Sequence, residues 1–151
     1  AVYGRFAELA PGRVILEGEV RTGERGTLSS PLKGAPCVAF FYTARYQSPS
    51  RGGGLALRPL RAVEGFHPFS LELEGGRVEA VPRSPGTFTQ ADHQALAANG
   101  YPGFTADEEL VGPRARVQIH GVLKHQGDDW TLTYHRLVRL EGKAKPKKKK
   151  R

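Results

Sequence analysis

The stretch FSLELEGGRVEAV, residues 69–81, shows most directly which kind of fold the chain adopts. Apolar and polar side chains alternate on both sides of a Gly-Gly pair, which is the pattern of strands that bury one face. Glycine tolerates positive φ, which the tight turns between antiparallel strands require. The stretch therefore predicts a β-hairpin in which Phe69, Leu71 and Leu73 face inward.

The same alternation recurs before and after this hairpin and predicts a mainly β chain. The further strands that it predicts cover residues 13–21, 37–47, 60–64, 114–125 and 130–140. In the last of these, Trp130, Leu132, Tyr134 and Val138 are expected to share the inward face. Residues 91–98 are expected to form a short helix, and residues 105–110 one more helical turn with Thr105 as its cap and Glu108 three residues later. The expected fold is a small antiparallel OB-like barrel or sandwich of six to seven strands with one or two short helices.

The charge divides the chain into a nearly neutral body and a basic end. Removing the seven basic residues of the end from the 23 Lys and Arg residues leaves 16, against 15 Asp and Glu residues. We expect a lead-in over residues 1–12, a β domain over residues 13–141 and a disordered tail over residues 142–151. The tail residues are Lys143, Lys145, Lys147, Lys148, Lys149, Lys150 and Arg151.

The segment SSPLKGAPCVAFFY, residues 29–42, places the single cysteine at the start of the most apolar strand. One cysteine excludes an internal disulfide and a zinc site with several thiolates. A catalytic thiol needs a lowered pKa and a nearby base, whereas the residues that flank Cys37 are apolar. The flanking residues favour packing as a small hydrophobic side chain, with a nucleophilic thiol as the other reading.

Four segments follow one another in an order that resembles the GIDE domain, also called the BAM ("beside a membrane") domain. They are GRVILEGEV, LSSPLKGAPCVAFFY, HPFSLELEGGRVEAVP and ELVGPRARVQIHGVL, which lie between residues 12 and 123, and the resemblance as a whole covers roughly residues 11–133. The Ser-Pro-Leu-x-Gly-x-Pro-Cys-Val segment of that family is matched in register. The resemblance implies structural roles for Pro31, Gly34, Pro36 and Cys37.

The resemblance also implies a setting beside a membrane. Members of the family, among them mitochondrial outer-membrane E3 ubiquitin ligases and many bacterial and archaeal proteins, carry the domain next to transmembrane helices. Ligase activity needs a RING finger, and a single cysteine cannot build its zinc site. What the resemblance implies is a non-catalytic protein-interaction module, bacterial and on the cytoplasmic side of the membrane, with this chain as the soluble fragment and with an unknown protein as partner.

The basic tail is the strongest electrostatic feature of the sequence. A polybasic segment is attracted to an anionic leaflet by about 1 kcal/mol per Lys or Arg, and it also binds nucleic-acid phosphates. A contact with an anionic membrane surface is the simpler expectation for a protein beside a membrane. A merely solvated terminus is the other interpretation.

The alternative function is an OB-type domain that binds single-stranded nucleic acid. Such domains stack bases on aromatic side chains inside a basic groove. Tyr42, Arg45 and Tyr46 supply side chains of this kind, and they are also a candidate interaction surface for a protein. The near-neutral charge of the body argues against nucleic acid.

No residue pattern in the chain indicates an enzyme. His120 and His135 are expected on the polar faces of the last two strands, where they could lie across from each other. Two ligands are too few for a zinc site, so solvated histidines are expected. We therefore expect no catalytic residues, no cofactor and no metal.

Overall fold

The computed structural model describes residues 1–140, so the expected tail lies outside the described residues. The described chain divides into two compact units. The barrel unit contains Ala1–Gly26, Pro68–Ser84 and the described residues from Gly112 onward, and the insertion unit contains Thr27–His67 and Pro85–Val111. The single β domain expected over residues 13–141 is thus shared between two units, because two long connections of the barrel pack on each other.

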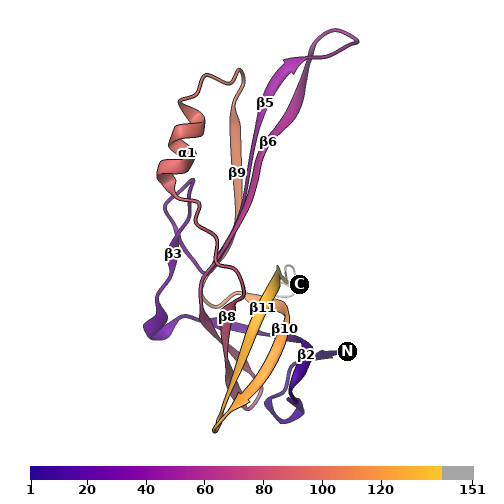
Figure 1. Cartoon of the computed structure of the whole chain (residues 1–151), viewed down its shortest axis with the longest axis vertical. Helices are drawn as coiled ribbons and strands as arrows, with labels where there is room; N and C mark the ends of the chain where they lie inside the picture. Colours follow the sequence, from indigo (N-terminus) through magenta and orange to yellow (C-terminus); the bar gives the residue numbers. More distant parts are fainter. Residues whose placement is uncertain (141–151) are drawn as a thin grey trace, which may run out of the picture. The chain divides into compact units, whose positions relative to one another are not determined.

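The barrel unit is a closed barrel of five strands with OB-like strand order. Its strands are β2 (Gly12–Arg21), β7 (Phe69–Leu73), β8 (Gly76–Pro82), β10 (Arg116–Gln126) and β11 (Asp129–Arg139). β2 pairs with both β7 and β10, and β8 pairs with β7 and, in parallel, with β11. The mainly β, OB-like fold predicted from the sequence is confirmed (Figure 1).

The expected lead-in over residues 1–12 belongs to the barrel unit. Its short strand β1 (Val2–Tyr3) pairs in parallel with β2, and a 3-10 turn η1 (Phe6–Glu8) follows. A second 3-10 turn, η2 (Gly23–Arg25), follows β2. The first residues of the described chain are therefore tied down by strand pairing.

The alternation that predicted the strands also fills the barrel interior. The hairpin around Gly75 forms as expected, with φ of 94° at that glycine. The fully buried side chains of the barrel include Leu16, Val20, Phe69, Leu71, Val78, Val117, Ile119, Leu123, Leu132 and Tyr134. These residues come from all five strands, so burial of one face of each strand closes the barrel.

A bulge changes the inward face of β11 relative to the prediction. His120 pairs with Arg136, and Gly121 pairs with Tyr134, so His135 is an extra residue on β11. Because one extra residue inverts the alternation beyond it, Leu137 is buried at 3% exposure. The prediction that Val138 faces inward was therefore wrong.

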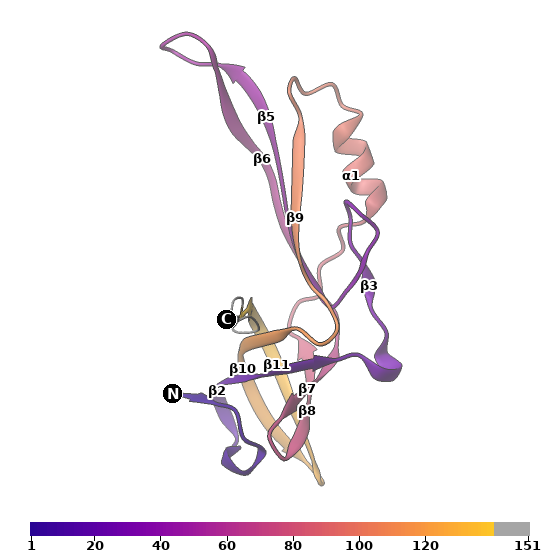
Figure 2. The same cartoon turned by 180° about the vertical axis from the view of Figure 1, so that it is seen from behind.

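The insertion unit is built on a three-stranded antiparallel sheet in the order β6-β5-β9. Its elements are β3 (Leu28–Ser29), β4 (Pro36–Cys37), β5 (Ala39–Pro49), β6 (Leu55–Phe66), α1 (Gln90–Ala97) and β9 (Thr105–Val111). β5 is the central strand, which fits a segment that is apolar on both faces. Figures 1 and 2 show α1 alongside this sheet. β6 is much longer than the predicted strand over residues 60–64.

The helical turn predicted for residues 105–110 was wrong, because this segment is strand β9. Ala106, Glu108 and Leu110 are partly buried in alternation with exposed neighbours, and the strand pairs with β5 along its whole length. Pairing with a long apolar strand overrides the local capping pattern. The capping box of this unit belongs to α1, where Thr89 and Asp92 exchange hydrogen bonds.

Candidate functional site

The Ser-Pro-Leu segment is held in place by the carboxylate of Glu108. The Ser30 hydroxyl donates to Glu108 Oε2 at 2.7 Å, the Leu32 N–H donates to Oε1 at 2.9 Å, and the Lys33 N–H donates to Oε2 at 3.0 Å. Ser30 Oγ in turn accepts from the Ala35 N–H at 3.0 Å. A carboxylate that accepts from two backbone N–H groups and a hydroxyl satisfies the donors of a tight loop.

The residues to which the resemblance gives structural roles all lie in or next to this loop. Pro31 is buried, and Pro36 begins β4. Gly34 has φ of 68°, and a Cβ there would lie 3.1 Å from the Gln90 side chain, so glycine fits both the backbone and the space. Sequence reasoning missed Glu108 because it assigned this residue to a helix, although the alternation over residues 105–111 was visible.

Cys37 is fully buried in the hydrophobic core of the insertion unit. Burial, with a smaller effect of the Glu108 charge, raises the pKa of its thiol to about 11. The thiol therefore stays protonated at neutral pH, which makes it a poor nucleophile. This environment agrees with the packing role that the flanking residues favoured.

The structure does not bring Tyr42, Arg45 and Tyr46 together on one surface. Tyr42 is 1% exposed, and its hydroxyl is 2.7 Å from Nδ1 of His93. Arg45 lies on the other face of β5, where it pairs with Asp107 at 3.3 Å. Alternate residues of a strand point to opposite faces, so a single platform of these three side chains cannot form.

Tyr42 and Tyr46 belong to the face of the sheet that α1 covers. The ring of Tyr42 packs against Phe88 with centroids 4.7 Å apart, and Tyr46 packs against Tyr101 at 5.4 Å. Burial raises the pKa of the Tyr42 hydroxyl, with a smaller contribution from Glu108. Both tyrosine rings therefore pack against other residues of the insertion unit.

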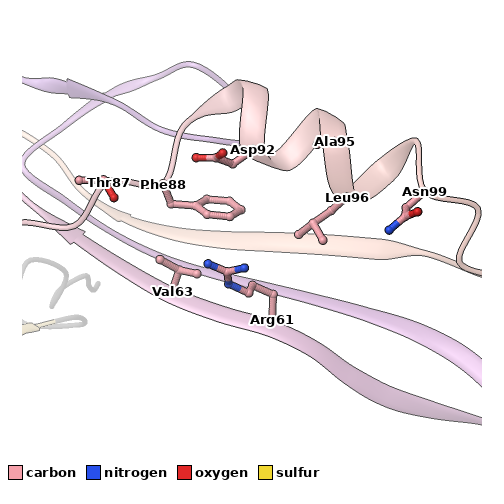
Figure 3. Close-up of a pocket in the computed structure, with 8 residues that line it drawn as sticks. All are labelled: Arg61, Val63, Thr87, Phe88, Asp92, Ala95, Leu96 and Asn99. Carbon is pink, nitrogen blue, oxygen red and sulfur yellow. The ribbon is translucent and has the colours of Figure 1, made fainter.

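A pocket of about 460 Å³ lies between β6 and α1. Figure 3 shows the Arg61 guanidinium facing the Phe88 ring, and its central carbon is 5.4 Å from the ring centroid. Asp92 also lines the pocket, but its carboxylate accepts from Thr89 in the helix cap. The pocket thus has the Phe88 ring on one side, and the Arg61 guanidinium lies against that ring.

The opposite face of the same sheet carries exposed apolar side chains. Leu55 and Leu57 are 65% and 59% exposed, and they pair with Pro49 and Gln47 of β5. Residues directly opposite each other share a face, so both leucines lie on the side away from Tyr42 and Tyr46. We call this surface the open sheet face; it comprises Phe41, Arg45, Leu55, Leu57, Phe66 and Asp107.

The aromatic residues of the open sheet face lie toward the other end of the hairpin. Phe41 and Phe66 meet edge to face with centroids 6.2 Å apart. Sequence reasoning missed Leu55 and Leu57 because it started the strand after the hairpin tip at residue 60, whereas β6 starts at Leu55. The alternating LALR pattern after the glycines was the signal that could have found them.

OB domains commonly bind ligands on the outer surface of the strands that correspond to β7 and β8. In this chain the arginines at that surface form ion pairs with carboxylates. Arg25 pairs with Glu79 of β8 at 2.6 Å, and Arg21 pairs with Glu72 of β7 at 2.6 Å. Guanidinium groups that are neutralised by carboxylates attract phosphates weakly. This surface therefore gives little support to nucleic-acid binding.

His120 and His135 do come together, as their predicted positions allowed. Their ring centroids are 6.4 Å apart. Within residues 1–140, no group of three or more His, Cys, Asp or Glu side chains is placed to hold a metal ion. Over the same residues, no helix has the length and apolar character needed to cross a membrane.

Comparison with known proteins returned no family model, no curated protein and no solved structure that matches the chain. The fold alone therefore defines its class, which is a mainly β protein with a closed five-stranded OB-like barrel. The resemblance to the GIDE domain stays a prediction.

Proposed function

We propose that the chain is a non-catalytic protein-interaction module of a membrane-associated protein. In this proposal the open sheet face receives a protein partner, and the basic C-terminal residues contact an anionic membrane on its cytoplasmic side in a bacterium. The observation that carries the proposal is the exposure of Leu55 and Leu57 on one face of a sheet whose other face is packed.

The exposed leucines are costly to leave in water. Full burial of a leucine side chain stabilises by about 1.5–3 kcal/mol, and clusters of apolar side chains at a surface commonly mark contacts with other proteins. The polar rim of the open sheet face, which includes the Arg45–Asp107 pair, matches the usual anatomy of an interface.

The non-catalytic part of this proposal is supported by the surroundings of the side chains that could react, which are buried or hydrogen-bonded within the insertion unit. The Cys37 thiol is buried with a raised pKa, the Tyr42 hydroxyl is bonded to His93, and the Glu108 carboxylate holds a loop. Each of these groups has a structural partner in the insertion unit.

Binding of single-stranded nucleic acid is the alternative function, and it has less support. Tyr42 is buried and Arg45 is paired with Asp107, so the expected stacking platform does not form. The basic tail remains a sequence feature that both functions can use.

Site-specific photo-crosslinking tests the proposed interaction. A photoreactive amino acid replaces Leu57 or, as the control, Arg77, which is an exposed residue of β8 in the barrel unit. In extracts of cells that produce the chain naturally, we expect position 57 to form a specific protein adduct that Leu55→Ser abolishes. Equal adducts from both positions, or none at position 57, would contradict the proposal.

A further inference from the structure

A second surface of interest lies entirely within the barrel unit. It is a hollow of about 650 Å³ on the outer side of β2, β10 and the residues around them. The side chains at this hollow that can donate hydrogen bonds are Tyr3, Arg13, Arg83, His120 and His135. We call this surface the histidine hollow.

The bulge in β11 lies at the histidine hollow. Because His135 is the extra residue opposite His120 and Gly121, both imidazoles stand on the outer side of the barrel. Their ring planes meet at 69° with centroids 6.4 Å apart. A Cβ at position 121 would collide with the Thr133 carbonyl oxygen, so glycine is required where the strands approach here. Bulges often redirect side chains at functional sites.

The two arginines reach the histidine hollow from other strands. Arg13 lies on β2 and pairs with Val122 in the register between β2 and β10. Arg83 follows β8 directly, and its backbone N–H donates to the Tyr134 carbonyl at 2.7 Å. This bond anchors the backbone from which the Arg83 side chain extends. The hollow thus gathers basic side chains from segments that are distant in sequence.

The charge in the histidine hollow is not balanced by acidic groups. Within residues 1–140, no Asp or Glu lines it, and neither Arg13 nor Arg83 forms an ion pair. Elsewhere on the barrel unit, by contrast, carboxylates pair with Arg5, Arg21, Arg25 and Arg116. Burial, then Arg136 and His135, lower the pKa of His120, which is the direction that uncompensated positive charge produces.

We propose that the histidine hollow binds a phosphoryl-type oxyanion. The guanidinium groups of Arg13 and Arg83 match the geometry of phosphate oxygens and donate to them. The imidazoles donate when protonated, and the Tyr3 hydroxyl supplies one more donor. This inference does not rest on the proposed protein interaction, because all five side chains belong to the barrel unit.

Binding in the histidine hollow depends on pH in a definite direction. The groups that surround His120 are Tyr3 of β1, Arg13 of β2, Arg83 after β8, and His135 and Arg136 of β11. All except Tyr3 are basic, and a bound oxyanion favours the protonated form of His120, so binding raises the pKa of this imidazole. Affinity for an anion of constant charge therefore increases as the pH falls through the pKa of His120 in the free protein, which burial lowers. Sulfate is such an anion across this range.

Nuclear magnetic resonance of the imidazole groups tests the site in the full chain. Titration with sulfate, and separately with inorganic phosphate, is expected to shift the His120 and His135 signals until they saturate. The dissociation constant for sulfate is expected to be smaller at lower pH. Arg13→Gln and Arg83→Gln should each weaken binding about tenfold, since each removes charge-assisted hydrogen bonds. Arg77→Gln is the matched control, because Arg77 is exposed on the same barrel outside the hollow, and it should leave the affinity unchanged.

Two results would overturn the site. One is the lack of any saturable shift at the two histidines with either anion. The other is equal affinity in the wild-type chain and in the Arg13→Gln/Arg83→Gln double variant. Unchanged signals from the Tyr134 ring show that the barrel of a variant is intact, since Tyr134 is 1% exposed in its core.

Vesicles distinguish the two sources of a phosphoryl group. We compare the Arg13→Gln/Arg83→Gln variant with the Arg77→Gln control in their binding to phosphatidylcholine vesicles that contain phosphatidic acid. Both variants keep the basic tail, so a difference in their affinity reports on the hollow. Weaker vesicle binding by the double variant assigns the site to a lipid headgroup. Equal vesicle binding, together with a response of the histidines to free phosphate, assigns it to a soluble phosphorylated ligand.

Discussion

Glu108 and Cys37 are two side chains that attach the Ser-Pro-Leu loop to the rest of the insertion unit. The Glu108 carboxylate joins β9 to a loop 78 positions away in sequence and satisfies two of its backbone donors. Cys37 follows that loop and packs in the hydrophobic core of the unit. The sequence predicted the Ser-Pro-Leu loop, but it did not predict that Glu108 binds it, because the two segments are too far apart in the chain for a local pattern to connect them.

Replacement of Glu108 by glutamine should destabilise the fold. The amide presents a donor where the loop already supplies donors, and the loss of hydrogen bonds to a charged group costs about 1.5–3 kcal/mol. Glu109→Gln, on the exposed side of the same strand, is the matched control and should change stability little. Urea unfolding of the two variants measures this difference, and equal midpoints would contradict the role of Glu108.

The raised pKa of Cys37 predicts a loss of stability at high pH. The thiol titrates near its ordinary value of 9.0 in the unfolded chain and at about 11 in the folded one. Between these values the unfolded chain binds fewer protons, so the stability from this group is present below pH 9 and declines as the pH rises to 11. Urea unfolding should show that the free energy of unfolding falls less between pH 9 and pH 11 in Cys37→Ala than in the unaltered chain. Equal falls in the two proteins would contradict a buried thiol.

At the scale of elements, strand pairing decided the cases that local patterns left ambiguous. Residues 105–110 carry a helix-capping pattern, yet they form β9 because they pair along β5. Residues 89–92 carry a similar pattern, and there the capping box does form. The bulge of β11 is a third case, since the partner strand determines where an extra residue is accommodated.

Alanine at position 121 tests the role of the bulge. Its Cβ would collide with the Thr133 carbonyl, and such overpacking costs about 1–3 kcal/mol. We expect Gly121→Ala to lower the midpoint of urea unfolding and to move the imidazole signals of His120 and His135. Gly112→Ala is the control, because a Cβ there meets no atom within 4 Å. Equal effects of the two substitutions would show that the close approach at Gly121 is unimportant.

At the scale of the whole molecule, the chain combines two compact units with a basic C-terminal segment. The units interleave along the sequence, since the insertion unit is formed from two connections of the barrel. The net charge of +8 comes almost entirely from the last residues. Membrane contact and docking of a protein partner are therefore assigned to different parts of the chain in the proposed function.

Replacement of the seven basic tail residues by glutamine tests the membrane contact. Since each contributes about 1 kcal/mol near an anionic leaflet, we expect affinity for phosphatidylserine vesicles to fall more than about a hundredfold. The binding of the unaltered chain should weaken as salt is raised. Co-sedimentation measures both effects.

An oligonucleotide titration of the same two proteins separates membrane contact from the alternative function. Oligonucleotide binding that persists without the tail charges would favour a nucleic-acid groove on the folded body. Vesicle binding that is unchanged without those charges would contradict the proposed role of the tail.

The sequence by itself determined the strands of the barrel, its two main hairpins, the central strand of the insertion unit, the short helix and the division between a neutral body and a basic end. These features follow from side-chain alternation, glycine placement and charge, which are properties of neighbouring residues. Only the tertiary structure decided the closure of the barrel, the partner of the Ser-Pro-Leu loop, the open sheet face and the histidine hollow. Each depends on contacts between segments far apart in the chain, and local propensities carry no information about which distant segments meet.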